Sequence, residues 1–310
     1  MAGGSEGSGA AILAAFLANT GIAVAKFVGF LITGSSAMLA ESVHSVADAS
    51  NQGLLVLGGR RSLRRPTKLH PLGYGRARYF WSFVVAVVLF SLGGLFSVYE
   101  GYHKITDPHE ITSPAVAFAI LGVAIVFEAF ALRTAMKHAR PLLQGRSWTQ
   151  YIRTSRSPEL PVLLLEDSGA LLGLVFAMVG IALALVTGNP VFDGLGTLAI
   201  GLLLLAIAIV LAIEMKSLLI GEAASDETIG LIESALTEGP DVRRLIHLVT
   251  QHLGPDDLLV AAKVEFDAAL TMRELAAAIN AAEKRVRAAV PAAKALYIEP
   301  DVYDPALASS

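Results

Sequence analysis

Residues 35–57 read SSAMLAESVHSVADASNQGLLVL, a stretch long and apolar enough for a membrane helix that nevertheless contains His44 and Asp48. A second such stretch, LPVLLLEDSGALLGLVFAMVGIALALV at residues 160–186, contains Glu166 and Asp167. An ionised side chain at bilayer depth costs at least about 2.5–3.5 kcal/mol, so residues of this kind usually have a function. The two stretches therefore predict a helical membrane protein and also the location of its site.

The composition agrees with a membrane protein. Only 16% of the 310 residues are charged and the mean hydropathy is +0.61, whereas soluble domains carry about 25% charged residues. The net charge of −3 argues against a nucleic-acid partner. Cysteine is absent, so any metal must be bound by histidine and carboxylate groups rather than by thiolates.

Six apolar stretches approach the roughly 20 residues that a transmembrane helix needs. They are Ala11–Thr33, Ser36–Leu57, Tyr79–Tyr102, Pro114–Thr134, Leu160–Val186 and Val191–Met215. We therefore expect a disordered N-terminus at 1–10, a six-helix transport domain at 11–215, a cytoplasmic domain at 216–303 and a short tail at 304–310. Glu100 and Glu128 are expected near the ends of their helices, where a carboxylate can reach the interface.

Basic residues are concentrated in two of the loops. Seven lie between the second and third stretches and six between the fourth and fifth: Arg60, Arg61, Arg64, Arg65, Lys68, Arg76, Arg78, and then Arg133, Lys137, Arg140, Arg146, Arg153, Arg156. Cytoplasmic loops of membrane proteins carry such an excess. We therefore expect both loops and both termini on the cytoplasmic side, with the arginines contacting lipid headgroups.

The segment after Met215 has the pattern of a small α+β domain. Helices are expected at Asp226–Glu238 and Thr271–Val290, and strands at Val242–His252, Leu258–Phe266 and Ala295–Glu299. Thr271 and Glu274 form a capping-box pattern at the start of the second helix. The order α-β-β-α-β predicts two helices on one face of a three-stranded sheet. Because such a small core is marginal alone, we expect a homodimer.

His44 and Asp48 are spaced i, i+4, so they lie one turn apart on the same face of a helix. An imidazole and carboxylates that face one another inside a membrane indicate a site for a divalent transition metal. Lys26, in the first stretch, is expected to pair with a carboxylate. Asp193 is expected to act like an N-cap near a membrane boundary.

Several local motifs resemble the cation diffusion facilitator family of zinc transporters. Residues 34–48, GSSAMLAESVHSVAD, resemble its first loop and second helix, and residues 70–75, HPLGYG, resemble its cytoplasmic loop. The motifs EDSGA at 166–170, NQ at 51–52 and GEAA at 221–224 are similar to the branch that includes the ninth human zinc transporter. The resemblance covers nearly the whole chain after residue 10 and implies six helices with a compact α+β tail.

The resemblance also implies a transport site. His44, Asp48 and Asp167 match family ligands, but Leu163 stands where the fifth helix usually has a histidine. The resemblance therefore leaves three protein ligands and an open fourth place. Glu166 is the nearest substitute, although it points about 100° away from Asp167 around the helix. Asn51, one turn beyond Asp48, is expected to hydrogen-bond a ligand.

Two further family sites are reduced in this sequence. His70 remains in the cytoplasmic loop, while Thr67 and Tyr74 replace an acid and a second histidine. The tail lacks a dense histidine and aspartate cluster, although His247, His252 and Glu299 are present. We therefore expect little metal binding at either place.

The sequence thus predicts a secondary transporter that exports a divalent cation, zinc foremost, in exchange for protons, and not an enzyme. Neutral His44 would ligate the metal and protonated His44 would release it, since metal and proton compete for the same lone pair. Transport of manganese, iron, cobalt or nickel is an alternative, as is a non-transporting regulator or scaffold; an intramembrane protease is disfavoured. No prosthetic group is expected, and the expected location is a bacterial cytoplasmic membrane.

Overall fold

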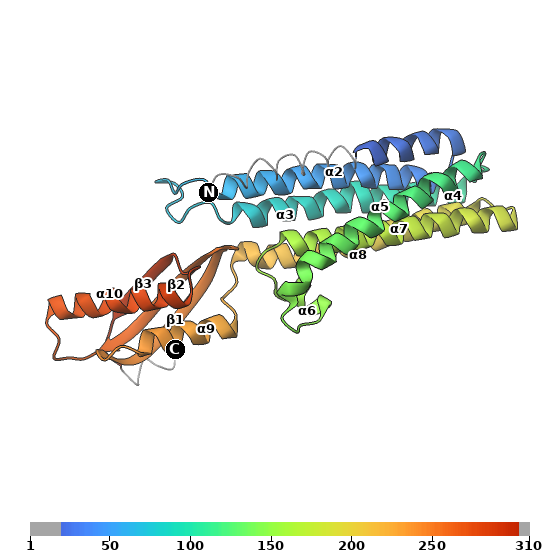
Figure 1. Cartoon of the computed structure of the whole chain (residues 1–310). Helices are drawn as coiled ribbons and strands as arrows, with labels where there is room; N and C mark the ends of the chain where they lie inside the picture. The colour runs from blue at the N-terminus through green and yellow to red at the C-terminus, as the bar shows by residue number, and fades with distance from the viewer. Residues whose placement is uncertain (1–19, 304–310) are drawn as a thin grey trace, which may run out of the picture. The chain divides into compact units, whose positions relative to one another are not determined.

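A computed structural model describes residues 20–303, and Figure 1 shows the order of its elements. The expected disordered segment at 1–10 and the tail at 304–310 lie outside the described residues. The described chain forms two compact units. One comprises the residues up to Gly58 together with Phe80–Lys216, and the other comprises Gly59–Tyr79 together with the residues from Ser217 onward.

The first unit consists of helices. They are the helix Thr20–Thr33, α2 (Ser36–Ser62), α3 (Ala77–Val88), the π-helix η1 (Leu89–Leu95), α4 (Phe96–Thr106), α5 (Pro114–Ala139), the 3-10 helix η2 (Arg140–Leu143), α6 (Trp148–Thr154), α7 (Glu159–Thr187) and α8 (Val191–Ile220). Four helical segments within the described residues are long and apolar enough to cross a membrane: Ala77–Thr106, Pro114–Leu143, Glu159–Thr187 and Val191–Ile220. The chain is therefore a helical membrane protein.

Helix α2 is long enough to span a bilayer, but it is too polar to be recognised as a membrane span from its hydropathy. Its 27 residues include Glu41, His44, Asp48 and Asn51. The helix Thr20–Thr33 is apolar but short. The structure thus supports four of the six expected spans on hydropathy and length alone.

Two kinds of contact hold helices of the first unit together. Glycines bring α7 and α8 together, because a Cβ at Gly180 would lie 2.9 Å from the Phe192 carbonyl oxygen and 3.2 Å from Gly196 Cα. The buried carboxylate of Asp193, on α8, accepts hydrogen bonds from Ser35 Oγ at 2.7 Å and from the Ser36 backbone N–H at 3.0 Å. Asp193 therefore caps the N-terminus of α2 and not that of its own helix.

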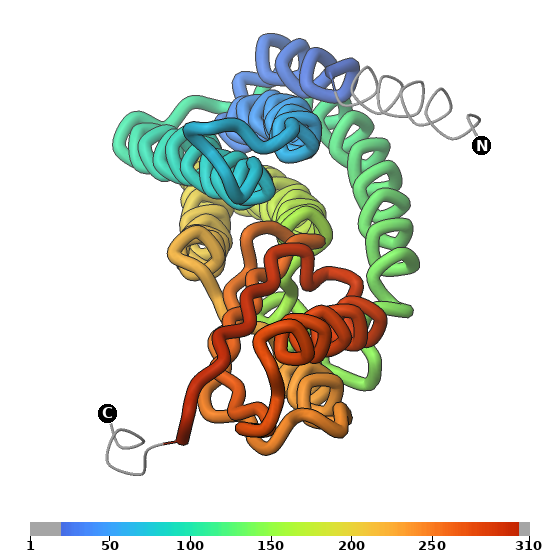
Figure 2. Tube along the Cα trace, turned by 90° about the vertical axis from the view of Figure 1, so that its left-hand side faces the viewer, coloured from blue at the N-terminus to red at the C-terminus, as the bar shows by residue number. Residues whose placement is uncertain are grey.

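The C-terminal part of the second unit is the expected α-β-β-α-β domain. Its elements are α9 (Asp226–Thr237), β1 (Val242–Gly254), β2 (Asp257–Phe266), α10 (Met272–Ala289) and β3 (Ala295–Pro300). The sheet order is β1-β2-β3, antiparallel between β1 and β2 and parallel between β2 and β3. Alternate residues of β2 are buried, and they form one core with residues of α9 and α10. Both helices therefore cover one face of the sheet, as Figure 2 shows.

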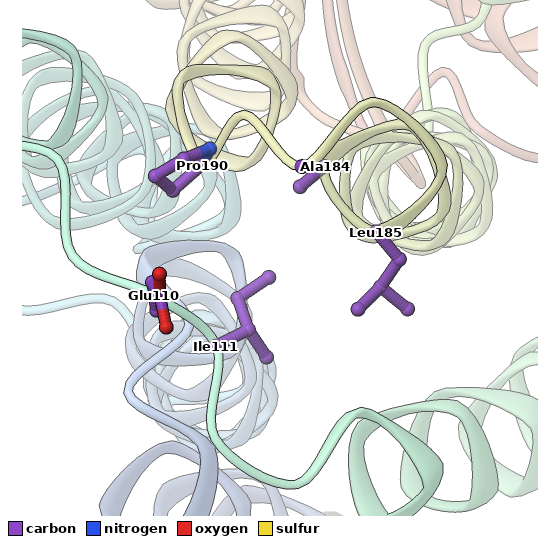
Figure 3. A pocket seen from close by; sticks show the side chains of 6 residues that line it. Glu110, Ile111, Ala184, Leu185 and Pro190 are labelled. Carbon is purple, nitrogen blue, oxygen red and sulfur yellow. The ribbon is translucent and has the colours of Figure 1, made fainter.

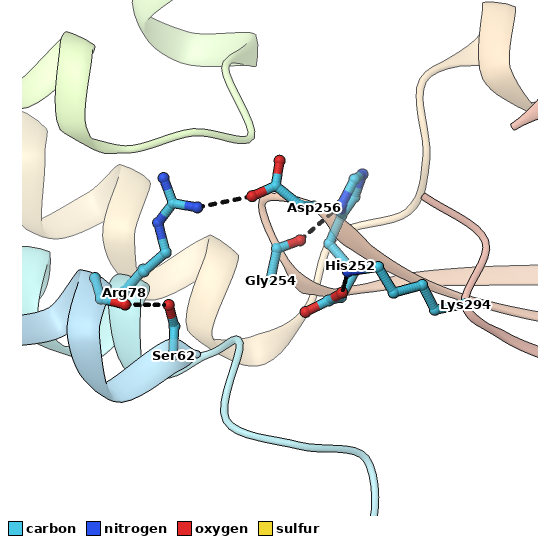
Figure 4. A network of polar contacts seen from close by, with 8 residues as sticks. Ser62, Arg78, His252, Gly254, Asp256 and Lys294 are labelled. Atoms are coloured by element: carbon cyan, nitrogen blue, oxygen red, sulfur yellow. Dashed lines mark hydrogen bonds and ion pairs between the residues drawn. The ribbon is translucent and has the colours of Figure 1, made fainter. Parts of the chain in front are cut away.

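The loop between α2 and α3 packs against the hairpin that joins β1 and β2. Arg78 Nη1 donates a hydrogen bond to Asp256 Oδ2 at 2.9 Å, and Figure 4 shows this contact beside His252 and Lys294. A Cβ at Gly75 would lie 2.6 Å from the Leu253 carbonyl oxygen, so only glycine fits there. This loop is consequently part of the second unit.

Candidate metal site

The first half of the site lies on α2, where His44 and Asp48 are one turn apart. The His44 side chain is fully buried and that of Asp48 is 13% exposed. His44 Nε2 lies 3.5 Å from Asp48 Oδ2, and the two atoms do not form a hydrogen bond. The two ligand types that the sequence placed on one helix face therefore do face each other.

The second half of the site comes from α7, through Glu166. Asn51 Nδ2 donates a hydrogen bond of 2.5 Å to Glu166 Oε1. The carboxyl groups of Asp48 and Glu166 also interact with each other electrostatically. Glu166 is only 4% exposed. Among the residues singled out from the sequence, the structure thus brings together His44, Asp48, Asn51 and Glu166.

Asp167 lies on a different side of α7. It is partly buried, and its electrostatic neighbours are first Glu128 and then Glu166. Leu163, one turn earlier on the same stripe, packs with Ala135 and Tyr151 on the side of α5 and α6. The stripe on which the family places histidine and aspartate therefore faces α5 in this structure, and the adjacent stripe with Glu166 faces α2.

Glu128 on α5 is a member of the site that the sequence analysis did not identify. It interacts electrostatically with Asp48, Glu166 and Asp167. Glu128 was expected near the membrane interface, but its electrostatic partners are side chains of α2 and α7. We call Asp48, Glu128, Glu166 and Asp167 the carboxylate cluster.

A buried ion pair lies beside the carboxylate cluster. Lys26 Nζ, from the helix Thr20–Thr33, is 3.0 Å from Glu41 Oε2 and donates a hydrogen bond of 2.8 Å to Ser45 Oγ. The Lys26 and Glu41 side chains are both fully buried. The expectation that Lys26 pairs with a carboxylate is confirmed, and the partner is Glu41.

Several buried polar atoms of the site have no hydrogen-bond partner among the described residues. They include both ring nitrogens of His44, Oδ1 of Asp48, Oδ1 of Asn51 and Oδ2 of Asp167. Buried polar atoms normally have a hydrogen-bond partner. Imidazole nitrogen and carboxylate or amide oxygen atoms are also ligand atoms that bind divalent transition metals. Within residues 20–303, however, no three His, Cys, Asp or Glu side chains are grouped closely enough to form a complete metal shell.

The segment that lies next to His44 is the π-helix η1. The π-helix η1 interrupts the segment Ala77–Thr106 between α3 and α4, and a Cβ on its Gly93 would lie 3.7 Å from His44 Nδ1. Short π-segments inside longer helices are frequent at functional sites. A Cβ there would lie closer to Leu204 and Leu89 than to the imidazole, so the glycine permits close packing of this segment beside His44, a feature that apolar periodicity alone does not reveal.

The other candidate positions offer fewer ligands. His70 stacks edge-on against Tyr74 with ring centroids 4.6 Å apart, and Tyr74 Oη hydrogen-bonds Thr67 Oγ1. A small pocket of about 150 Å³ between the α4–α5 and α7–α8 loops has one carboxylate, Glu110, beside Ile111 and Pro190 (Figure 3). Neither place has the mixed ligand set found around His44.

Comparison with known proteins identifies the family. The cation efflux transmembrane domain matches residues 12–220. The chain belongs to the cation efflux family. This family consists of transporters, which agrees with the membrane helices and the buried charged side chains described above.

Curated relatives match along most of the chain. The proton-coupled zinc antiporter SLC30A9, mitochondrial, of Homo sapiens is 33% identical over 270 residues, which cover 86% of this chain and 48% of that protein. Metal tolerance protein C4 of Arabidopsis thaliana is 29% identical over 80% of this chain and 55% of its own length. The zinc transporter ZitB of Pectobacterium atrosepticum is 27% identical over 82% and 75%, respectively. The chain thus spans about half the length of the first two relatives.

Proposed function

We propose that this chain exchanges a divalent transition-metal ion, zinc foremost, for protons across a membrane. The observation that carries this proposal is the convergence of His44 and Asp48 on α2 with Glu166 on α7. Buried nitrogen and oxygen atoms of this site have no hydrogen-bond partner within the part of the chain that the structure describes. Relatives named as a proton-coupled zinc antiporter and a zinc transporter support the choice of cargo. The ion is the transported substrate and not a resident cofactor.

The chemistry follows from the charges at the site. The four acidic groups of the carboxylate cluster interact electrostatically with one another, and His44 lies 3.5 Å from one of them, Asp48. Uncompensated charges inside a membrane protein are costly. Positive charge must therefore enter the cluster, either as a metal ion or as protons. Because both bind the same lone pairs, the arrival of one favours the departure of the other.

The ligand set bears on metal choice. One imidazole with carboxylates and an amide suits zinc, and it also accepts manganese, iron, cobalt and nickel. We propose His44, Asp48 and Glu166 as protein ligands, with Asn51 orienting Glu166 and with Asp167 and Glu128 as neighbouring acids. The assignment of Asp167 as a direct ligand, which the family resemblance implies, stays a prediction.

The membrane arrangement forms part of the proposal. Six spans are proposed by adding α2 and the helix Thr20–Thr33 to the four apolar segments, since these two carry the polar groups that face the site. We propose that both termini lie on the cytoplasmic side, because the two basic loops carry the excess of Lys and Arg that is typical of that side. A homodimer and a bacterial cytoplasmic membrane remain expectations from the sequence, and the human relative's name places that protein in the mitochondrion.

Transport by purified protein in vesicles tests the function. Zinc entry and internal pH are followed together, with manganese, iron, cobalt and nickel in parallel. Zinc-dependent proton movement in the opposite direction is the expected result. Metal flux without proton movement would contradict antiport, and the absence of any flux from folded, inserted protein would favour a regulator or scaffold.

A further inference from the structure

A groove outside the site runs along one face of α5. It has a volume of roughly 1100 Å³ and is bounded by α5, η2, Trp148 of α6 and Leu171 of α7. All of these elements belong to the first unit. The α5 residues that line it share one stripe of the helix at spacings of three and four: Val126, Ala129, Phe130, Arg133, Met136, Lys137 and, at the start of η2, Arg140.

The chemistry of the groove changes along the helix. Its first part is apolar, where Val126 and Phe130 are 68% and 71% exposed. Its last part carries Arg133, Lys137 and Arg140, and this end leads into the basic loop that we place on the cytoplasmic side. The groove is therefore apolar toward the membrane centre and cationic toward the interface.

The three cations of the groove are available to a ligand. They are exposed, and within residues 20–303 they form no side-chain hydrogen bond or ion pair. Arg146, in the same basic loop, provides the contrast, because it donates to the carbonyl oxygens of Leu142 and Leu143 and to Thr154 Oγ1. Arg146 therefore holds the loop together, while the groove cations have no such structural role.

The groove does not suit the transported metal, since none of its described lining residues is a carboxylate and three positive charges repel a cation. A free anion would leave the apolar half empty. Basic pockets between transmembrane helices on the cytoplasmic side suit anionic lipid headgroups. We propose that this groove binds one anionic phospholipid, with its phosphate among Arg133, Lys137 and Arg140 and an acyl chain against Phe130 and Leu171.

Native mass spectrometry of the full chain in detergent tests the proposal. Phosphatidylglycerol, phosphatidylcholine and inorganic phosphate are titrated separately. Phosphatidylglycerol is expected to bind at one site, and a variant with Arg133, Lys137 and Arg140 changed to Gln is expected to bind it at least about tenfold more weakly. The matched control changes Arg60, Arg64 and Arg65 to Gln, removing the same charge from the other basic loop, and it should retain nearly wild-type binding.

A second variant leaves the charge unchanged, so it tests the groove even if the triple variant fails to insert. Leu171→Trp fills the apolar half and should also weaken phosphatidylglycerol binding. Equal binding of phosphatidylglycerol and phosphatidylcholine would overturn the proposal. Equal losses in the groove and control variants would also overturn it, as would unchanged binding in Leu171→Trp. Displacement of the lipid by inorganic phosphate would identify a simple anion site instead.

Discussion

The membrane unit and the C-terminal sheet unit use charge in opposite ways. In the membrane unit, Lys26, Glu41 and His44 are fully buried, while large apolar side chains such as Phe130 and Val126 are exposed. In the sheet domain the core cluster is apolar throughout. Its ion pairs, such as Lys263 with Asp301, lie on the surface. The exposed apolar residues are what a lipid-facing surface requires.

This difference shows where the charges serve function. Surface ion pairs contribute about 0–1 kcal/mol, and a buried ion pair is often no more stabilising than well-packed apolar residues. The charges buried between α2 and α7 are therefore poorly explained by stability. The sheet domain can be understood from packing and capping alone.

The largest expected effect is on transport. Asp48→Ala should abolish metal flux, because it removes a proposed ligand of the transported ion. The protein should still insert, because a carboxylate inside the membrane opposes insertion and its removal does not. Flux in vesicles and the amount of folded protein are measured together, with the exposed Asp301→Ala as control. Normal flux in Asp48→Ala would exclude the proposed site.

Breaking the buried ion pair should cost the most stability. Glu41→Gln leaves the Lys26 ammonium buried without its counter-charge and should destabilise the membrane unit by about 3–5 kcal/mol. The double variant Lys26→Met, Glu41→Leu should recover most of this loss, because it removes both charges. Thermal or denaturant unfolding in detergent provides the measurement, and a double variant as unstable as Glu41→Gln would count against this account.

The sheet domain should respond to packing in the ordinary way. Ile232 is fully buried in the core, so Ile232→Ala should lower the free energy of unfolding of this domain by about 2–5 kcal/mol. The neighbouring Leu231 is 48% exposed, and Leu231→Ala should change it by less than about 0.5 kcal/mol. Hydrogen exchange of the β2 amides in the full chain measures the change in the free energy of unfolding for both variants. Similar losses in the two variants would mean that α9 packs differently.

The choice between Glu166 and Asp167 tests which stripe of α7 forms the site. Glu166→Gln should weaken zinc binding by about tenfold, or about 1.4 kcal/mol, and Asp167→Asn should weaken it less. Leu163→His should leave the affinity unchanged, since Leu163 packs toward α5 and α6. Calorimetry on the purified protein separates the cases, and tighter zinc binding in Leu163→His would restore Asp167 as the ligand.

The smallest effect concerns the start of α10. Hydrogen bonds from the Thr271 hydroxyl and backbone N–H lower the pKa of the Glu274 carboxyl below its ordinary value of 4.5. The ionised carboxylate therefore stabilises the folded state above that value, and the contribution is lost as the pH falls through the lowered pKa. Glu274→Gln should reduce the thermal midpoint slightly at neutral pH and not in acid. A difference that persists in acid would refute this linkage.

Much of the sheet domain could be predicted from sequence because its signals are local. The Thr271–Glu274 capping box fixes the start of α10, and the alternation in Leu258–Phe266 fixes the buried face of β2. For the site, the spacing of His44 and Asp48 was sufficient. The rotation of α7 was not predictable, because this helix is apolar on most sides and Glu166 and Asp167 differ by only about 100°. The position of Glu128 depends in the same way on how α5 is turned.

The segment Gly59–Tyr79, which runs from the last residues of α2 to the first residues of α3, belongs to the same unit as the C-terminal sheet. This segment begins at the end of the helix that carries His44 and Asp48, yet it packs on the β1–β2 hairpin through Gly75 and Arg78. A cut at Ser217 would therefore split one structural module in two. Anyone who builds chimeras by exchanging tails between relatives should transfer residues 59–79 together with the tail, because the closely packed glycines Gly75 and Gly254 leave no room for a mismatched partner.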